Sequence, residues 1–184
     1  MKSRIWMAGV GVCLAMGMAG AVSGAEYYIN DTYVPGEDIY TSATGHDGNP
    51  GTAALPKATV GNVIGTCNLQ PGDVVYIDTG TYGPVVISNT VAGVAGTNIT
   101  FQGVLPSKLA SGGTIIAGSG YLLDVRGKYL SFMDIQAVGG SWGVALSGAA
   151  HCEFTRVHCI SNGQHGVRNS GAANSNLFSR CVVN

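Results

Sequence analysis

The chain has 184 residues, of which only 10% are charged, and its formal net charge is −1. Glycine is abundant, with 29 residues, and β-branched residues are frequent. This composition favours a β-rich fold with many turns and few helices. Acidic residues concentrate before residue 79 and basic residues after residue 100. The sequence has no stripe of basic residues interleaved with aromatic residues, the pattern that would indicate a surface for nucleic acid.

The first 25 residues have the three parts of a secretory signal peptide. Lys2 and Arg4 form a positively charged start, residues 5–20 are apolar, and Ser23-Gly24-Ala25 offers small residues for cleavage. No later stretch is long and apolar enough to span a bilayer. We therefore expect residues 1–25 to be a signal peptide and the mature protein to be secreted, periplasmic or attached to the cell surface.

A polar loop and a short helix are the first elements expected in the mature chain. Residues 44–52 are rich in glycine and proline, and Asp47 and Asn49 are placed to form Asx turns with nearby amides. Apolar side chains then recur at helical spacing, which predicts a short amphipathic helix that ends at the turn formed by residues 71–73. They are Val60, Val63, Ile64 and Cys67. We expect a structural loop rather than a metal site.

Short β runs separated by glycine, asparagine and serine follow that turn. Residues 74–78 form the first predicted strand of the sheet, because three of them are β-branched. The later predicted strands cover residues 85–87, 99–102, 114–117, 121–125, 130–138, 144–146, 152–160 and 178–183. A chain of this kind, with one helix and many short strands, is predicted to be all-β.

The order of motifs from residue 44 to residue 82 resembles a known fold family. The motif residues, which we expect to be structural, are Asp47, Asn49, Gly51, Thr52, Pro71, Gly72, Asp73, Gly80 and Tyr82. In this order they resemble the start of a secreted right-handed parallel β-helix of the pectate-lyase-like superfold. The resemblance implies a solenoid in which residues 26–72 form an N-terminal cap with a short helix and residues 73–184 form about five coils.

An internal repeat supports the solenoid without the resemblance. Residues 130–137 match residues 152–159 with an offset of 22, and residues 143–150 match residues 166–173 with an offset of 23. Periods of this size indicate stacked structural repeats. Side chains along a strand alternate between the two faces of the sheet. With a two-residue bend after each phenylalanine, this alternation predicts that two sets of side chains point into the core: Leu130, Phe132, Ile135 and Ala137, and Cys152, Phe154, Val157 and Cys159.

The register of the last coil follows from the cost of burying a charge. An offset of 23 from the preceding coil would place Arg180 in the core, where an unpaired guanidinium is very unfavourable. An offset of 24 places Phe178, Cys181 and Val183 there instead, so we predict that offset. The chain then stops within a coil, which predicts that it is truncated at its C-terminus.

The mature chain has four cysteines, an even number that is typical of disulfides in exported proteins. The predicted register makes Cys159 and Cys181 diagonal neighbours, beyond comfortable bridging distance. We therefore favour free, buried cysteines that pack as small hydrophobic residues, with disulfides as the alternative.

The same register aligns Asp134, Arg156 and Arg180 on the outside of successive coils, with His158 beside them. Arginine matches the geometry of a carboxylate, so this stripe is a candidate carbohydrate-binding surface for an acidic polysaccharide. The alternative is a surface ladder of ion pairs with little energetic consequence. The three other histidines, His46, His151 and His165, are expected to be solvated.

The leading functional hypothesis is an exported or cell-surface β-helix module with a polysaccharide-facing binding or structural role. Polysaccharide lyases of the superfold use an acidic calcium cluster beside a basic residue, whereas acidic residues here occur once per coil, at Asp124, Asp134 and Glu153. The residues present indicate no cofactor. One alternative is the N-terminal fragment of a polysaccharide lyase or glycoside hydrolase whose active site and calcium lie in later coils. Another is an adhesin or fibre.

Overall fold

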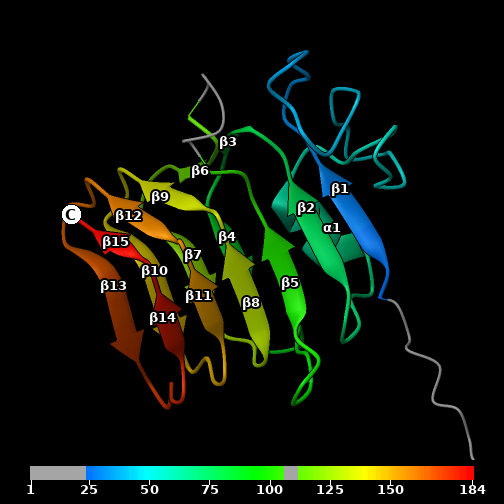
Figure 1. Cartoon of the computed structure of the whole chain (residues 1–184). Helices are drawn as coiled ribbons and strands as arrows, with labels where there is room; N and C mark the ends of the chain where they lie inside the picture. Colours follow the sequence, from blue (N-terminus) through cyan, green and yellow to red (C-terminus); the bar gives the residue numbers. More distant parts are fainter. Residues whose placement is uncertain (1–23, 106–111) are drawn as a thin grey trace, which may run out of the picture.

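Three parallel sheets make up the fold of the chain. The computed structural model describes residues 24–105 and 112–184, so the predicted signal peptide lies almost wholly outside the described residues. The first sheet contains, in spatial order, β1 (Glu26–Ile29), β2 (Val74–Ile77), β5 (Ile99–Gln102), β8 (Leu130–Met133), β11 (Glu153–Thr155) and β14 (Leu177–Ser179) (Figure 1). The second contains β4 (Val85–Ile87), β7 (Tyr121–Val125), β10 (Trp142–Ser147) and β13 (His165–Ser170). The third contains β3 (Gly80–Tyr82), β6 (Thr114–Ala117), β9 (Gln136–Val138), β12 (His158–Ile160) and β15 (Val182–Val183).

Each pass of the chain, here called a coil, visits the first, third and second sheets in that order. The coils are β2-β3-β4, β5-β6-β7, β8-β9-β10 and β11-β12-β13, and β14-β15 begin a fifth. All pairings between these strands are parallel. Over the described ranges, no helix has the length and apolar character needed to cross a membrane. The protein is therefore mostly β, with parallel sheets throughout.

A ladder of phenylalanine rings runs through the core and fixes the register of the coils. Phe101, Phe132, Phe154 and Phe178 stack with centroid distances of 5.2, 5.0 and 4.5 Å. Phe154 pairs with Phe178, which confirms the offset of 24. All eight predicted inward residues of the two preceding coils are buried. Phe178 remains 36% exposed because no described strand lies beyond β14.

A sharp bend separates the first and third sheets in each later coil. Asp134, Arg156 and Arg180 occupy this bend with φ angles of 60°, 54° and 55°. The left-handed conformation costs a non-glycine residue about 1–2 kcal/mol, so the packing on both sides must hold it. The predicted bend is confirmed, but it divides each of the predicted strands 130–138, 152–160 and 178–183 into two strands.

The first sheet begins earlier in the chain than predicted. β1 pairs with β2 in parallel, and the ring of Tyr28 stacks on Tyr76 at 5.1 Å. The prediction that residues 74–78 form the first strand is therefore wrong. Residues 26–29 belong to the segment expected to cover the first coil as a cap, but their backbone groups pair with the edge that β2 exposes.

The polar loop is held by partners that are distant in sequence. Asp47 Oδ1 accepts hydrogen bonds from the amides of Ala58 and Thr59 at 3.1 and 3.0 Å, and Asn49 donates to the carbonyl of Pro56 at 2.9 Å. The predicted Asx turns are therefore wrong, because these bonds reach forward to the segment just before the helix. In the part of the chain that the structure describes, no group of three or more His, Cys, Asp and Glu side chains is placed to hold a metal ion.

The predicted helix is α1 (Val60–Thr66), but it ends at Thr66 rather than at the turn formed by residues 71–73. Thr59 caps it, and the Thr59 hydroxyl accepts a hydrogen bond from the amide of Asn62. Val60 and Val63 are buried, whereas Ile64 and Cys67 are only partly buried. Val60 lines the same small interior cavity as Ile77, so α1 covers one end of the hydrophobic core.

A buried carboxylate ties the loop before the helix to the first coil. Asp78 is fully buried and accepts hydrogen bonds from the amides of Ile39, Tyr40, Thr41 and Thr79 at 2.8–3.0 Å, and from the hydroxyl of Thr41. Such a group is tolerated in a core only when its oxygens are well bonded. Asp78 therefore fixes residues 39–41 against the coil.

The remaining predicted motif residues also lie in turns and local networks. Asp73 is buried and accepts from the amides of Ala25 and Gln70 at 2.7 and 2.8 Å. Tyr82 is buried, and its hydroxyl donates to the carbonyl of Asp78 at 3.1 Å. In the turn before Asp73, Gly72 has a φ angle of 94°, a backbone conformation that glycine adopts without a steric penalty.

The four cysteines within the described ranges are free, as predicted. Cys152 and Cys159 are buried, while Cys67 and Cys181 are partly buried. Burial raises the pKa of the Cys152 thiol and raises that of Cys159 to about 11. These thiols therefore stay protonated at neutral pH and pack as apolar groups.

Candidate functional site

The predicted binding stripe lies on the bend between the first and third sheets. Asp134 and Arg156 form a two-point ion pair, in which Nε of Arg156 lies 2.5 Å from Oδ1 and Nη2 lies 2.7 Å from Oδ2. Gln102 of the preceding coil also donates to Oδ2 of Asp134 at 2.8 Å. The hydrogen bond from Arg156 to Asp134 raises the pKa of the guanidinium. These contacts form one step of an ion-pair ladder.

The other two predicted stripe residues are placed differently. Arg180 is exposed and makes no ion pair with any of the residues described. His158 lies on β12 between Gln136 and Val182 and is partly buried. The structure thus brings Asp134 and Arg156 together and leaves Arg180 accessible. The carbohydrate-binding role of the stripe stays a prediction.

A second group of polar and aromatic side chains, which we call the aromatic–arginine cluster, lies on the outside of the second sheet. The rings of Tyr121 on β7 and Trp142 on β10 stack at 4.5 Å with an interplanar angle of 29°. The guanidinium carbon of Arg168 on β13 lies 5.6 and 5.3 Å from the two ring centroids. Nη1 of Arg168 also donates a hydrogen bond to the hydroxyl of Tyr121.

The register of the second sheet explains how Arg168 reaches a residue two strands away. Tyr121 pairs with Trp142, and Ala145 pairs with Arg168. Arg168 is therefore three register positions beyond the two rings, and its long side chain extends diagonally back along the sheet to reach both of them. A cation held over aromatic rings gains about 0.5–2 kcal/mol. The cluster therefore holds one edge of the guanidinium in place.

Near the cluster, a carboxylate on β7 pairs with a second arginine that directly follows the strand. The side chain of Asp124 is 3% exposed, and its Oδ2 lies 2.5 Å from Nη2 of Arg126, whose side chain is 51% exposed. This hydrogen bond raises the pKa of the Arg126 guanidinium. Oδ1 of Asp124 is buried and has no hydrogen-bond partner among the described residues. A buried oxygen without a partner costs about 1–3 kcal/mol, so the ion pair with Arg126 offsets only part of the cost of burying Asp124.

This face combines features that suit recognition of a carboxylated, hydroxyl-rich ligand. Arg168 and Arg126 supply cationic donors, and Trp142 supplies an apolar ring. Exposed His165 lies next to Trp142 in the register. Sequence reasoning missed the cluster. The available signal was the pair of offsets, 21 and 23, that places Tyr121, Trp142 and His165 in one row.

Comparisons with known proteins identify similar folds but no family. No protein-family model matches the chain, and no curated protein matches it. A solved structure named rhamnogalacturonan lyase has a TM-score of 0.51 and 19% identity, over 86% of this chain and 51% of that one. The GH136 lacto-N-biosidase from Eubacterium ramulus has a TM-score of 0.49 and 16% identity, over 84% of this chain and 30% of that one. The chain thus spans at most about half the length of these proteins.

Proposed function

We propose that the chain is an exported right-handed parallel β-helix module that binds acidic polysaccharide at the aromatic–arginine cluster. Three observations support the fold: parallel sheets, a repeated order of strands, and similarity to the rhamnogalacturonan lyase structure. Export rests on the signal-peptide pattern of residues 1–25. The name of the similar lyase makes rhamnogalacturonan a reasonable first ligand.

The position of Arg168 is the observation that carries the binding proposal. Its guanidinium lies over Tyr121 and Trp142, but no described carboxylate pairs with it. A preorganised arginine loses less entropy on binding, and its fork matches a uronate carboxylate with two parallel hydrogen bonds. The stripe is less suited to binding a carboxylate, because its Arg156 already pairs with Asp134.

Binding is favoured over hydrolysis by the number of carboxylates in the cluster. Glycoside hydrolases generally place two carboxyl groups on either side of the scissile bond. Within the described ranges, the cluster contains one, Asp124, and that group is engaged by Arg126. A polysaccharide lyase or glycoside hydrolase remains the alternative function, and product release in the binding assay would detect it.

The test is titration calorimetry of the purified chain with oligogalacturonate and with rhamnogalacturonan oligosaccharides at low salt. We expect binding that weakens as salt is added, because mobile ions screen exposed charges. Loss of a charge-assisted hydrogen bond in Arg168→Ala should weaken binding roughly tenfold or more. Arg168→Lys should recover only part of it, because lysine lacks the planar fork.

The matched control is Arg180→Ala, which removes the same charge from the stripe on another face. Equal affinity in this variant and the unchanged chain is expected. If Arg180→Ala together with Arg156→Ala abolishes binding while Arg168→Ala does not, the site is the stripe. No binding of either oligosaccharide at low salt would refute the proposed function, and unsaturated or shortened products would establish the enzymatic alternative.

A further inference from the structure

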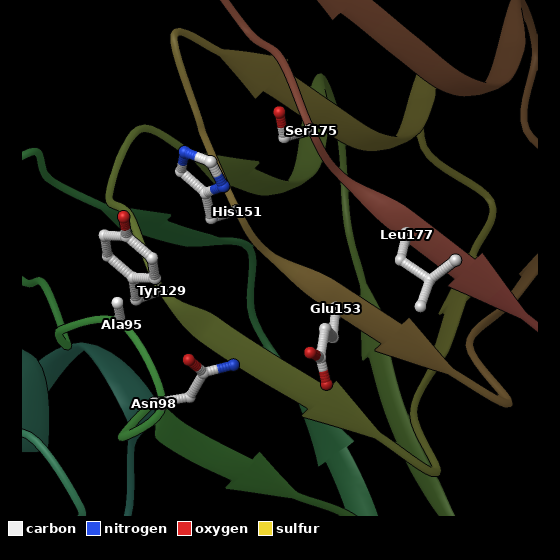
Figure 2. A pocket seen from close by; sticks show the side chains of 8 residues that line it. Ala95, Asn98, Tyr129, His151, Glu153, Ser175 and Leu177 are labelled. Atoms are coloured by element: carbon white, nitrogen blue, oxygen red, sulfur yellow. The ribbon is translucent and has the colours of Figure 1, made fainter.

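A groove of about 610 Å³ lies on the outside of the first sheet. Figure 2 shows the side chains that line it, which are not those of the aromatic–arginine cluster. Ala95 and Gly96 lie on one wall, in a turn closed by mutual backbone hydrogen bonds between Val94 and Thr97. Residues 88–98 connect β4 to β5 and are longer than the corresponding connection, residues 148–152, between β10 and β11. The groove therefore exists because this early connection is extended.

A row of side chains lines the groove, one from each of three successive coils. The rings of Tyr129 and His151 stack at 4.8 Å and are almost parallel, with an angle of 5°. The amide of Tyr129 donates to the carbonyl of Ala150, and that of His151 to Asn174, so the next position in the row is Ser175. The stack ends there, because serine has no ring. Figure 2 shows His151 between Tyr129 and Ser175, so its second ring face has no aromatic neighbour in the row.

Two hydrogen-bond acceptors lie beside the rings. Glu153 on β11 is exposed and forms no ion pair with any residue in the described ranges. Asn98 donates its amide nitrogen to the hydroxyl of Ser131 at 2.8 Å, which leaves its carbonyl oxygen available. Leu177 adds an apolar side chain that is 60% exposed. Among the described residues, none of those that line the groove is a lysine or an arginine.

We propose that this groove is a second ligand site, which binds a neutral saccharide chain. A binding site typically combines aromatic and apolar surface with a few fixed polar groups. Here the open ring face of His151 and the side chain of Leu177 suit the C–H face of a sugar, while Glu153 and Asn98 accept hydrogen bonds from its hydroxyl groups. The carboxylate of Glu153 repels a uronate, so the groove selects against the ligand proposed for the cluster.

The test is titration of the purified chain with three neutral hexasaccharides, of glucose, mannose and galactose. Oligogalacturonate provides the anionic arm and a chitosan hexamer the cationic arm. We expect at least one neutral ligand to bind with an affinity that does not change between low and high salt. Glu153→Gln and His151→Ala should each weaken that binding, by roughly tenfold for the loss of a charged acceptor.

Thr155→Ala is the matched control, because Thr155 lies two residues further along β11 and outside the groove. It should leave the affinity unchanged, and thermal unfolding should show that all three variants fold. The proposal is refuted if none of the neutral hexasaccharides binds, or if the chitosan hexamer is the one ligand that binds. Uronate binding lost in Arg168→Ala but retained in His151→Ala tests the cluster separately, so either site can fail without the other.

Discussion

Truncation of the central ring of the phenylalanine ladder tests how the coils are held together. Phe154 is fully buried and stacks on Phe132 at 5.0 Å and on Phe178 at 4.5 Å. Replacing a buried phenylalanine by alanine costs about 3–5 kcal/mol, including the cavity that remains. Each stacked neighbour contributes about 0.5–1.5 kcal/mol beyond burial. Two such contacts place Phe154→Ala at about 4–5 kcal/mol, near the top of this range.

Urea unfolding measures this loss directly, provided that the dependence on urea is unchanged between variants. Phe178→Ala should cost only about 1–2 kcal/mol, because that ring is 36% exposed and has a single stacked neighbour. Glu153→Ala, on the outside of the same strand, should change stability by less than about 0.5 kcal/mol. If Phe154→Ala and Glu153→Ala lowered the free energy of unfolding equally, the assignment of inward and outward faces would be refuted.

Three further predictions concern the helix, a buried carboxylate and a thiol. Val63→Asp should lower the free energy of unfolding by several kcal/mol and Ile64→Asp by less, because Val63 is fully buried and Ile64 only partly; equal losses in urea would contradict the observed face of α1. Asp78→Ala should make residues 39–41 a site of rapid limited proteolysis, since four backbone donors lose their acceptor, and an unchanged cleavage pattern would count against this role. Stability should fall as pH rises from about 9 towards 11, because the Cys159 thiol ionises near its ordinary pKa of 9.0 when unfolded but only near about 11 when folded; the same fall in Cys159→Ala would exclude this cause.

The core was predictable from sequence because each inward residue repeats at nearly constant spacing in the later coils. Phe132, Phe154 and Phe178 are separated by 22 and 24 residues, and the cost of burying Arg180 was enough to choose between two offsets. The earlier coils do not share this spacing, since Phe101 precedes Phe132 by 31 residues. The Phe101–Phe132 spacing is larger because β5 ends at Gln102 and β6 begins only at Thr114, and β4 and β5 are likewise far apart in sequence, so the repeat could not be followed back to β2.

The strands that sequence reasoning missed have few buried apolar residues. β13 runs from His165 to Ser170, and only Gly166 in it is buried. It forms because its backbone pairs with β10, whose own apolar residues are already in place. β3 likewise has one buried side chain, Tyr82. Such strands are determined by the neighbouring coil rather than by their own alternation.

The outer faces were the least predictable part, because their contacts depend on side-chain reach as well as on register. Asp134 and Arg156 were correctly placed in adjacent coils, and their ion pair follows from that. Arg168, in contrast, contacts Tyr121, 47 residues away, by extending diagonally across the sheet. Because the guanidinium reaches across two strands, the contact joins two positions that the sequence repeat does not relate.

Separate faces on one stack of coils allow the two proposed sites to differ in charge. The aromatic–arginine cluster has Arg168 without a carboxylate partner among the described residues, and the groove has Glu153 without a cationic one. The inward residues of the same strands hold the core, so changes to either face alter little of the packing that positions the other. Sites on different faces with no shared contacts should act additively. In the double variant Arg168→Ala with His151→Ala, the affinity for each ligand should therefore fall by the same factor as in the corresponding single variant. A larger fall in affinity would mean that one ligand spans both faces.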